Sequence, residues 1–214
     1  DATITKTDFS NADLTGAKIS DANLRKVILS GTIFTEATKL SYSTISDTDL
    51  NGVDFSGADL TGINLSGTDL TGANFSGAIL YRAELSNTIL AGADISGTIL
   101  VSSDLSGTNL SGNDLSGTIL AGADLSDVIL TGADLSGKDL TGTILARADL
   151  SYSNLTETNL SYSILIRTSL HGANLAGSDL SNSDLTGANL DDANLTDTIL
   201  TDAILDCSNH AVCN

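Results

Sequence analysis

Residues 58–62 read ADLTG, and residues 123–127 read ADLSD. The same five-residue unit recurs along nearly the whole chain: a small residue, a polar residue, a large apolar centre, Ser or Thr, and often Gly. The centre is Leu, Ile or Phe at every fifth residue from Ile4 to Phe34. After one extra residue the series runs without a break from Leu40 to Leu205. A repeat of this length decides the fold.

The small residue stands two places before each centre. It is Ala, Ser or Thr in 35 of the 41 units and Val in three more, and the exceptions are Ile63, Asn113 and Lys138. We expect Asn113 either to find a hydrogen-bond partner inside or to turn outward. Lys138 is expected to extend its ammonium outward or to distort its coil.

A period of five fits neither an α-helix nor a flat strand. Five residues advance a helix by about 500°, so the centres would face all sides, and odd spacing on a strand alternates between faces. The chain must therefore turn a corner once per unit. All 20 Gly stand two residues after a centre, where a corner needs backbone freedom. Pro is absent, because it would remove an N–H from the ladder between coils.

These residues resemble the pentapeptide-repeat family, whose pattern is A(D/N)LXX, over residues 2–205. The resemblance implies an all-β fold, the right-handed quadrilateral parallel β-helix, a β-solenoid with four pentapeptides per coil. About ten coils follow, and at ~4.8 Å per coil they imply a rod ~50 Å long. We assign residues 1–205 to this solenoid and 206–214 to a short C-terminal tail. The one-residue insertion, near 35–39, should bulge one corner.

Composition excludes several classes of protein. The chain has 214 residues, 27 Asp and Glu against 9 Lys and Arg, and a net charge of −18. Its hydrophobic content of 41% argues against a disordered acidic chain. The acidity argues against direct nucleic-acid binding, because little would neutralise phosphates. No apolar run approaches the ~18 residues of a membrane span.

Stacking at 20 residues per coil predicts an acidic face. The residue before each centre points outward in this family, and residues 20 apart then lie one above another. Asp94, Asp114 and Asp134 follow one another on this face. We interpret them as a solvated face. The alternatives are an acidic patch for a protein partner and a Ca²⁺-bridged face, although the calcium-binding repeat G-G-x-G-x-D is absent.

Ile occupies the outward position on several successive coils. We interpret these side chains either as ordinary β-surface residues or as a lateral interface with another copy or another protein. The candidate interface residues are Ile79, Ile99, Ile119, Ile144 and Ile164.

Nothing in the sequence predicts an enzyme, a cofactor or a metal centre. The two histidines, His171 and His210, have no Ser or paired-carboxylate partner in a recognisable arrangement, and a filled solenoid offers no deep pocket. Cys207 and Cys213 suit a local disulfide that closes the tail. The same cysteines with His210 spell C-x2-H-x2-C, which lacks a fourth zinc ligand.

The chain starts at Asp1 without an initiator Met. We expect a mature exported protein, extracellular, periplasmic or lumenal, and an excised or renumbered chain is the alternative. A local disulfide suits an oxidising compartment.

The function predicted is that of a rigid, non-catalytic structural or interaction protein. Its partners would be other copies of itself, stacked end to end and extending to a filament if the contact does not close. The alternative implied by the family is a cytoplasmic, DNA-mimicking acidic rod that binds a type II topoisomerase such as DNA gyrase. A weaker alternative is an ice- or surface-binding solenoid, with regular rows of Ser such as Ser56, Ser76 and Ser96.

Overall fold

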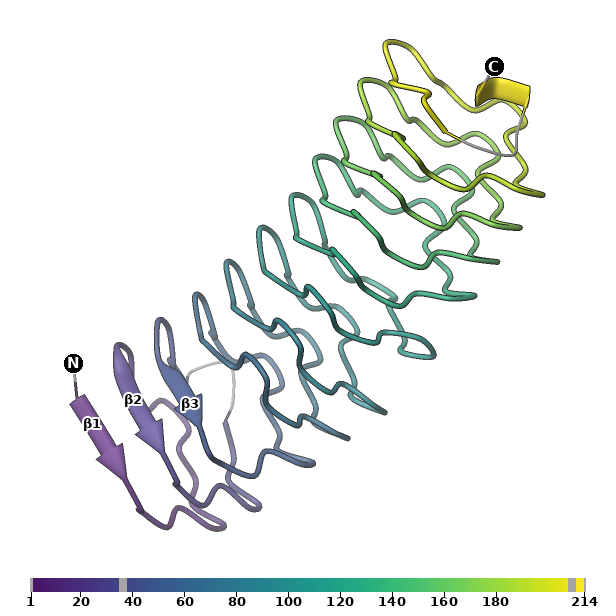
Figure 1. The fold of residues 1–214 in the computed structure, drawn as a ribbon. Helices are drawn as coiled ribbons and strands as arrows, with labels where there is room; N and C mark the ends of the chain where they lie inside the picture. The colour runs from purple at the N-terminus through teal and green to yellow at the C-terminus, as the bar shows by residue number, and fades with distance from the viewer. Residues whose placement is uncertain (1, 35–37, 208–210, 214) are drawn as a thin grey trace. The chain divides into compact units, whose positions relative to one another are not determined.

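The protein consists of coils that are joined by parallel pairing within each of two compact units, described by a computed structural model over residues 2–34, 38–207 and 211–213 (Figure 1). The predicted one-residue insertion near 35–39 falls largely on residues 35–37, which lie outside the described residues. Coils that follow one another in the sequence lie side by side, as the repeat predicts.

Regular secondary structure is short because each side of a coil is only a few residues long. The strands β1 (Ala2–Thr5), β2 (Ala22–Arg25) and β3 (Thr44–Ser46) form a parallel sheet in the order β1-β2-β3. Later coils pair through isolated parallel bridges at the outward position of each unit. The 3-10 helix η1 (Ala211–Cys213) follows the last coil.

The coils fall into two compact units. Unit 1 comprises Asp1–Thr108 and Asn113–Ile119, and unit 2 comprises Asn109–Gly112 and Leu120–Asn214. The five-residue repeat builds the coils of both units.

The pairing register locates the insertion. Ala2 pairs with Ala22, which is a step of 20 residues, whereas Asn23 pairs with Thr44, a step of 21. Later pairs such as Thr44 with Asn64 return to 20. The extra residue therefore lengthens a single coil and leaves the stacking of the later coils unchanged.

A typical corner is a four-residue turn closed by one backbone hydrogen bond. In a representative turn the Ala58 N–H donates to the Phe55 carbonyl at 3.0 Å. The third residue of the turn, Gly57, has a φ of 65°. This left-handed conformation is the one that glycine adopts most easily. All 20 Gly have positive φ, which confirms the predicted reason for their placement.

Nineteen other residues share the corner position and its positive φ. They include Tyr42, Tyr152 and Arg147, which are bulky side chains that rarely adopt this conformation. The repeated fold, and not the local residue, therefore sets the backbone at each corner.

The core contains one large and one small side chain from each pentapeptide. Leu24, Leu29 and Leu60 are at most 1% exposed, and so is the small residue Ala58. Three Phe stack on successive coils of unit 1, with ring centroids 5.0 Å apart for Phe34 and Phe55. The next pair, Phe55 and Phe75, is 5.2 Å apart.

Buried Ser and Thr take the small position because their hydroxyls reach carbonyl oxygens. Thr98 Oγ1 donates to the Ile95 carbonyl at 2.7 Å, and Thr158 Oγ1 donates to the Leu135 carbonyl at 2.8 Å. Among the described residues, no buried side-chain nitrogen or oxygen lacks a hydrogen-bond partner. The core therefore tolerates hydroxyls without the cost of an unpaired polar group.

The two polar residues at the small position are accommodated differently. Asn113 points inward, and its Nδ2 donates to the carbonyls of Leu90 at 3.0 Å and Ala93 at 2.9 Å. Lys138 is half-buried, and its charge is one of the causes that lower the pKa of Asp134, after hydrogen bonds from Ser136. The ammonium therefore lies near the acidic surface.

Candidate interaction surfaces

The outward Asp and Asn side chains brace the corners. Asp69 Oδ1 accepts a hydrogen bond from the Thr71 N–H at 3.0 Å and another from its hydroxyl at 2.6 Å. Asn64 Oδ1 accepts from the Ser66 N–H at 3.0 Å in the same way. Asp and Asn are interchangeable at this position because both present an oxygen at the same place.

These hydrogen bonds favour the ionised carboxylate. The Ser10 hydroxyl, and then its N–H, lower the pKa of Asp8, and the same pair from Thr71 lowers the pKa of Asp69. Much of the acidity is therefore carried by carboxylates that already accept hydrogen bonds within their own turns.

The predicted acidic face has the same local structure. Asp94 and Asp114 lie in unit 1, and Asp134 lies in unit 2. Their Oδ1 atoms accept from the N–H groups of Ser96, Ser116 and Ser136 at 3.0, 2.8 and 3.1 Å. The Ser96 hydroxyl also donates to Asp94, at 2.7 Å, so it is turned toward the carboxylate.

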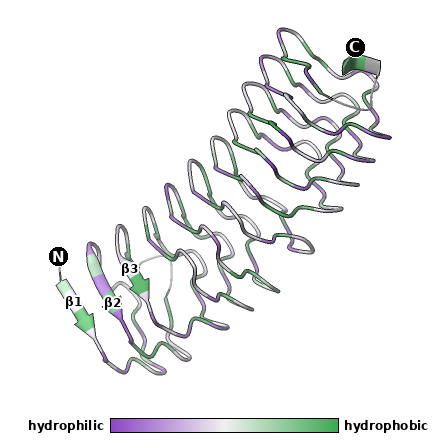
Figure 2. Ribbon diagram, in the orientation of Figure 1, coloured by the Kyte–Doolittle hydropathy of each residue, from purple (hydrophilic) through white to green (hydrophobic). Residues whose placement is uncertain are grey.

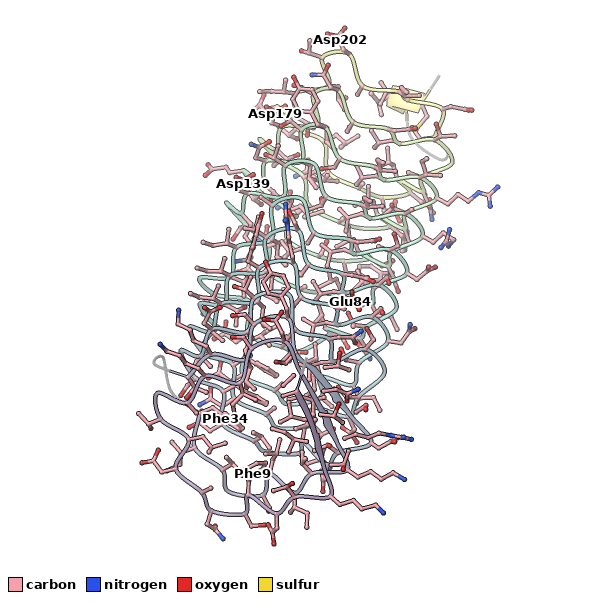
Figure 3. All side chains as sticks on the ribbon, turned by 90° about the vertical axis from the view of Figure 1, so that its left-hand side faces the viewer. Phe9, Phe34, Glu84, Asp139, Asp179 and Asp202 are labelled. Atoms are coloured by element: carbon pink, nitrogen blue, oxygen red, sulfur yellow. A yellow bond between two sulfur atoms is a disulfide. The ribbon has the colours of Figure 1, made fainter. Side chains whose placement is uncertain are left out.

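Acidic side chains also follow one another on other sides of the coils. Asn159 pairs with both Asp139 and Asp179 in unit 2, and Figure 3 labels these two Asp on the same side of the unit. Asp202 is labelled on the last coil. The negative charge is distributed over several sides of the coils, because every pentapeptide has an outward position that Asp can occupy.

An apolar ladder interrupts this polar surface in unit 1. Ile79 pairs with Ile99, and Ile99 pairs with Ile119, so three of the predicted interface residues lie in vertical register. Ile79 is 36% exposed and Ile119 is 45% exposed, while Ile99 between them is half-buried. Figure 2 shows hydrophobic and hydrophilic segments alternating within each coil. This ladder is the longest uninterrupted run of outward Ile among the described residues.

The other two predicted interface residues form a separate pair. Ile144 and Ile164 are bridged to each other in unit 2, and Ile164 continues to Asp184. Ile164 is 39% exposed and Ile144 is half-buried. The five Ile therefore provide two patches, one in each unit.

The outermost coils leave their core layers incompletely covered. In the first coil the centres are only half-buried, whereas in the second coil they are buried; the half-buried centres are Ile4, Phe9, Leu14 and Ile19. In the last coil Leu195, Leu200 and Leu205 are again only half-buried. Within the described residues, each of these coils is paired with one neighbouring coil.

Charge is distributed unevenly between the first and last coils. Residues 2–39 contain five of the nine Lys and Arg. No Lys or Arg follows Arg167, whereas seven Asp do. Residues 2–39 also contain four acidic residues, Asp8, Asp13, Asp21 and Glu36. The end of unit 1 that contains β1 is therefore close to neutral, whereas the last coils of unit 2 have Asp but no Lys or Arg.

The C-terminal tail is closed by a disulfide. Cys207 and Cys213 are bonded, with their Cα atoms 5.1 Å apart. Neither cysteine is therefore available as a thiolate ligand in this state, and His210 lies outside the described residues. Within those residues, no helix is both long enough and apolar enough to span a membrane.

One cluster was missed by the sequence reasoning. His171, Asp191 and Asp192 of unit 2 each present a ligand atom, and these atoms lie within 4.8 Å of one another. The spacing in the sequence could have predicted this cluster, because Asp191 follows His171 by 20 residues and therefore lies in the next coil, beside it.

The comparisons with known proteins identify the repeat. The family model described as pentapeptide repeats matches in eight copies, at residues that include 1–31, 48–127, 123–161 and 163–202. No curated protein sequence matches the chain.

Solved structures provide a second comparison. HetL, a pentapeptide-repeat protein involved in heterocyst differentiation regulation in the cyanobacterium Nostoc sp. strain PCC 7120, is 32% identical. That alignment covers 95% of this chain and 87% of HetL, with a TM-score of 0.45. Rfr23 from the cyanobacterium Cyanothece 51142 is 27% identical over 55% of this chain and 91% of its own, with a TM-score of 0.43.

A third structure shows the fold. A trypsin-treated form of QnrB1, a plasmid-mediated fluoroquinolone resistance protein, is 21% identical over 93% of this chain and 89% of its own, with a TM-score of 0.51. The predicted right-handed quadrilateral parallel β-helix is thereby confirmed.

Proposed function

Because the chain belongs to the pentapeptide-repeat family, we propose that it is a non-catalytic interaction protein that associates with further copies of itself, end to end. The incomplete burial of the outer core layers carries this proposal. Phe9 and Leu14 are half-buried in the first coil, whereas Leu29 and Phe34, one coil later, are at most 1% exposed. A second copy placed against this layer would complete its burial.

The backbone of the first coil supports the same contact. Ile28 and Ile33 donate their N–H groups to carbonyls of the preceding coil, at 3.0 Å in both cases. Asp8 and Asp13 hold the same positions in the first coil, and their N–H groups have no backbone partner within the described residues. Carbonyls from the last coil of another copy would continue the parallel ladder in the same direction.

Electrostatics favour head-to-tail contact over contact between two last coils. The five cations of residues 2–39, which are nearly balanced by four acidic residues, would meet the anions that follow Arg167. Contact between two last coils would instead bring seven Asp of each copy together. A head-to-tail contact is heterologous, so it forms a filament unless it closes into a ring.

The Ile ladder offers a lateral contact between copies as a lesser contribution. Ile79, Ile99 and Ile119 span three coils, about 10 Å from first to last at the spacing of neighbouring strands. A stable interface buries about 800 Å² on each partner. So short a ladder is insufficient alone, and we assign it to side-by-side contact between copies already associated end to end.

We further propose that the protein resides in an oxidising compartment outside the cytosol, extracellular, periplasmic or lumenal. The Cys207–Cys213 disulfide supports this location, because such bonds persist where thiols are not kept reduced. The test is mass spectrometry of protein taken from its native source after thiol blocking. Two alkylated cysteines would contradict the location.

Sedimentation velocity over a range of protein concentrations, with negative-stain electron microscopy, tests the proposed association. We expect the sedimentation coefficient to rise with concentration and elongated particles to appear. Monodisperse monomer at high concentration, in both low and high salt, would overturn the proposal.

The second candidate function is an acidic surface that mimics duplex DNA and occupies a type II topoisomerase such as DNA gyrase. It is favoured by residues 40–137, which contain twelve Asp and Glu but only one basic residue, Arg82. A gyrase supercoiling assay tests it. No inhibition or protection at micromolar protein would remove this candidate.

A further inference from the structure

We propose that His171, Asp191 and Asp192 form a binding site for a divalent transition-metal ion, with Zn²⁺ the best fit. Their ligand atoms lie within 4.8 Å of one another. One imidazole nitrogen and two carboxylates form a donor set that zinc accepts, whereas Ca²⁺ and Mg²⁺ prefer oxygen alone. Asp191 and Asp192 are among the anions assigned to the proposed end-to-end contact, and the metal site does not depend on that contact.

The coil register brings these residues together. Asp191 follows His171 by one coil, and the Gly172 N–H donates to the Asp191 carbonyl at 2.8 Å, which fixes the two backbones. The Asn189 Oδ1 accepts from the Asp191 N–H at 3.0 Å. Asp192 occupies the corner beside it, with a φ of 56°, and both Asp side chains are exposed and free to rotate toward an ion.

Tyr152 orients the imidazole. Its hydroxyl is 2.8 Å from His171 Nε2, and the two rings meet edge to face with centroids 5.0 Å apart. Gly172 permits this arrangement, because a Cβ there would lie 2.7 Å from the Tyr152 ring. A hydrogen bond on the outer nitrogen of a histidine is the usual support for a metal ligand at the other nitrogen.

The other nitrogen, Nδ1, lies near two oxygen atoms of Asp191. Nδ1 lies 3.1 Å from the Asp191 carbonyl oxygen and 3.7 Å from its carboxylate Oδ2. We assign the proton to Nδ1 in the absence of a metal, because the carbonyl oxygen that it faces can only accept a hydrogen bond. An ion would take the place of this proton, and Nε2 would take up a proton from solvent and donate a hydrogen bond to the Tyr152 hydroxyl. The neutral ring therefore changes tautomer with no net proton release.

The later coils provide no permanent cation to the site. No Lys or Arg follows Arg167 in the sequence, so no fixed positive side chain from the neighbouring later coils can neutralise Asp191 and Asp192. A divalent ion would supply that charge. The competing description is a protonated His171 paired with Asp191 and no metal.

The presence of only two histidines makes the test direct. Zn²⁺ is titrated into the oxidised full-length protein while the imidazole ¹⁵N resonances are recorded by NMR and the affinity is measured by calorimetry. We expect the His171 resonances to report metal on Nδ1 and a proton on Nε2. The variants H171Q and D191N/D192N should lose saturable binding, and Y152F should weaken it about tenfold.

Two matched variants serve as controls. H210Q removes the other histidine, and D202N removes an exposed corner Asp in the same unit, so both should bind Zn²⁺ like the wild type. The proposal is overturned if the wild type shows no saturable binding, if Zn²⁺ shifts only His210, or if H171Q binds as tightly as the wild type.

Discussion

At the residue scale, the corner position shows how the repeat overrides local preference. Tyr42 has a φ of 57°, and its ring lies against Gly62, one coil above. A left-handed conformation costs a residue with a Cβ about 1–2 kcal/mol. The neighbouring coils supply this energy through core packing and the ladder. Gly at a corner thus has two roles. It avoids the strain of a positive φ, and in some coils it leaves space for a side chain of the preceding coil.

Two glycine substitutions separate these roles. Gly52→Ala meets nothing within 4 Å, so we expect a loss of about 1 kcal/mol in the free energy of unfolding. Gly62→Ala has nearly the same φ but places its Cβ 2.5 Å from the Tyr42 ring, and it should cost more. Chemical denaturation measures both.

The control for the ring is a double variant. In a protein that already carries Tyr42→Ser, adding Gly62→Ala should lower the free energy of unfolding by about as much as Gly52→Ala lowers it in the wild type. Equal losses for Gly52→Ala and Gly62→Ala with Tyr42 present would contradict the role assigned to the ring.

The braced carboxylates predict a pH dependence. Hydrogen bonds, from the hydroxyl first, lower the pKa of Asp8, Asp69 and Asp134 below the ordinary 3.8. A lowered pKa in the folded state contributes stability above the unfolded value, and this contribution is lost as pH falls through the folded value. We therefore expect stability to decline from about pH 5 to pH 2.

Changing all three Asp to Asn tests this origin. Asn keeps the Oδ1 acceptor and removes the titration, so the triple variant should lose less stability over that interval when thermal unfolding is followed by circular dichroism. An unchanged pH slope would show that other groups are responsible.

At the scale of one coil, polar side chains are tolerated only where their hydrogen bonds match the site. The Asn113 Nδ2 donates to two carbonyls inside unit 1. Asn109 instead points outward, and its Oδ1 accepts from the Ser111 N–H at 3.0 Å. The same residue type therefore acts as a donor inside and as an acceptor outside.

Asn→Asp substitutions at positions 113 and 109 test these two roles. Asn113→Asp would place carboxylate oxygens against two carbonyls with no donor, at a cost of about 1–3 kcal/mol. Asn109→Asp keeps its acceptor and should be close to neutral. Urea denaturation of both variants measures the difference, and equal stability would contradict the assigned orientation of Asn113.

Much of the coil could be predicted from the sequence because the physical constraint repeats. A centre every fifth residue predicts the buried layer, and one extra residue before Leu40 predicts the register step of 21 that Asn23 and Thr44 show. The positive φ of Tyr152 could not be predicted from its own propensity, since Tyr disfavours that conformation. It follows only from its place in the repeat.

The candidate sites were less predictable because they depend on side-chain geometry. The sequence predicts that Ile79, Ile99 and Ile119 stack, but it does not predict that Ile99 is half-buried between the other two. The 20-residue spacing places Asp191 above His171, yet their contact also requires the Tyr152 ring over Gly172. The five-residue pattern predicts neither the position of the Tyr152 ring nor the tautomer of His171.

At the scale of the whole molecule, the uneven charge makes association sensitive to salt. In the proposed head-to-tail contact, Lys and Arg side chains of residues 2–39, although nearly balanced by acidic residues in sequence, would pair with the anions after Arg167. Added salt screens this attraction over about 8 Å at physiological ionic strength. We therefore expect association to weaken between low and moderate salt, as seen by light scattering.

Charge reversal locates this effect. Lys6→Glu with Lys26→Glu should weaken association and remove its salt dependence, because both residues lie in the first two coils. Arg82→Glu, in the middle of unit 1, should alter association much less. If both variants weaken association equally for each unit of charge changed, only the net charge of the protein matters, and the proposed location of the contact is contradicted.

Sedimentation velocity of one end variant and two side variants tests the central claim most directly. Phe9→Asp places a charge in the half-buried layer of the first coil, Ile119→Asp places one on the Ile ladder, and Ile89→Asp places one on a side that we assign to no contact. The account predicts that Phe9→Asp, with its circular dichroism unchanged, remains monomeric at concentrations where Ile89→Asp associates like the wild type, while Ile119→Asp still associates end to end. Association of Phe9→Asp at the wild-type level would contradict it.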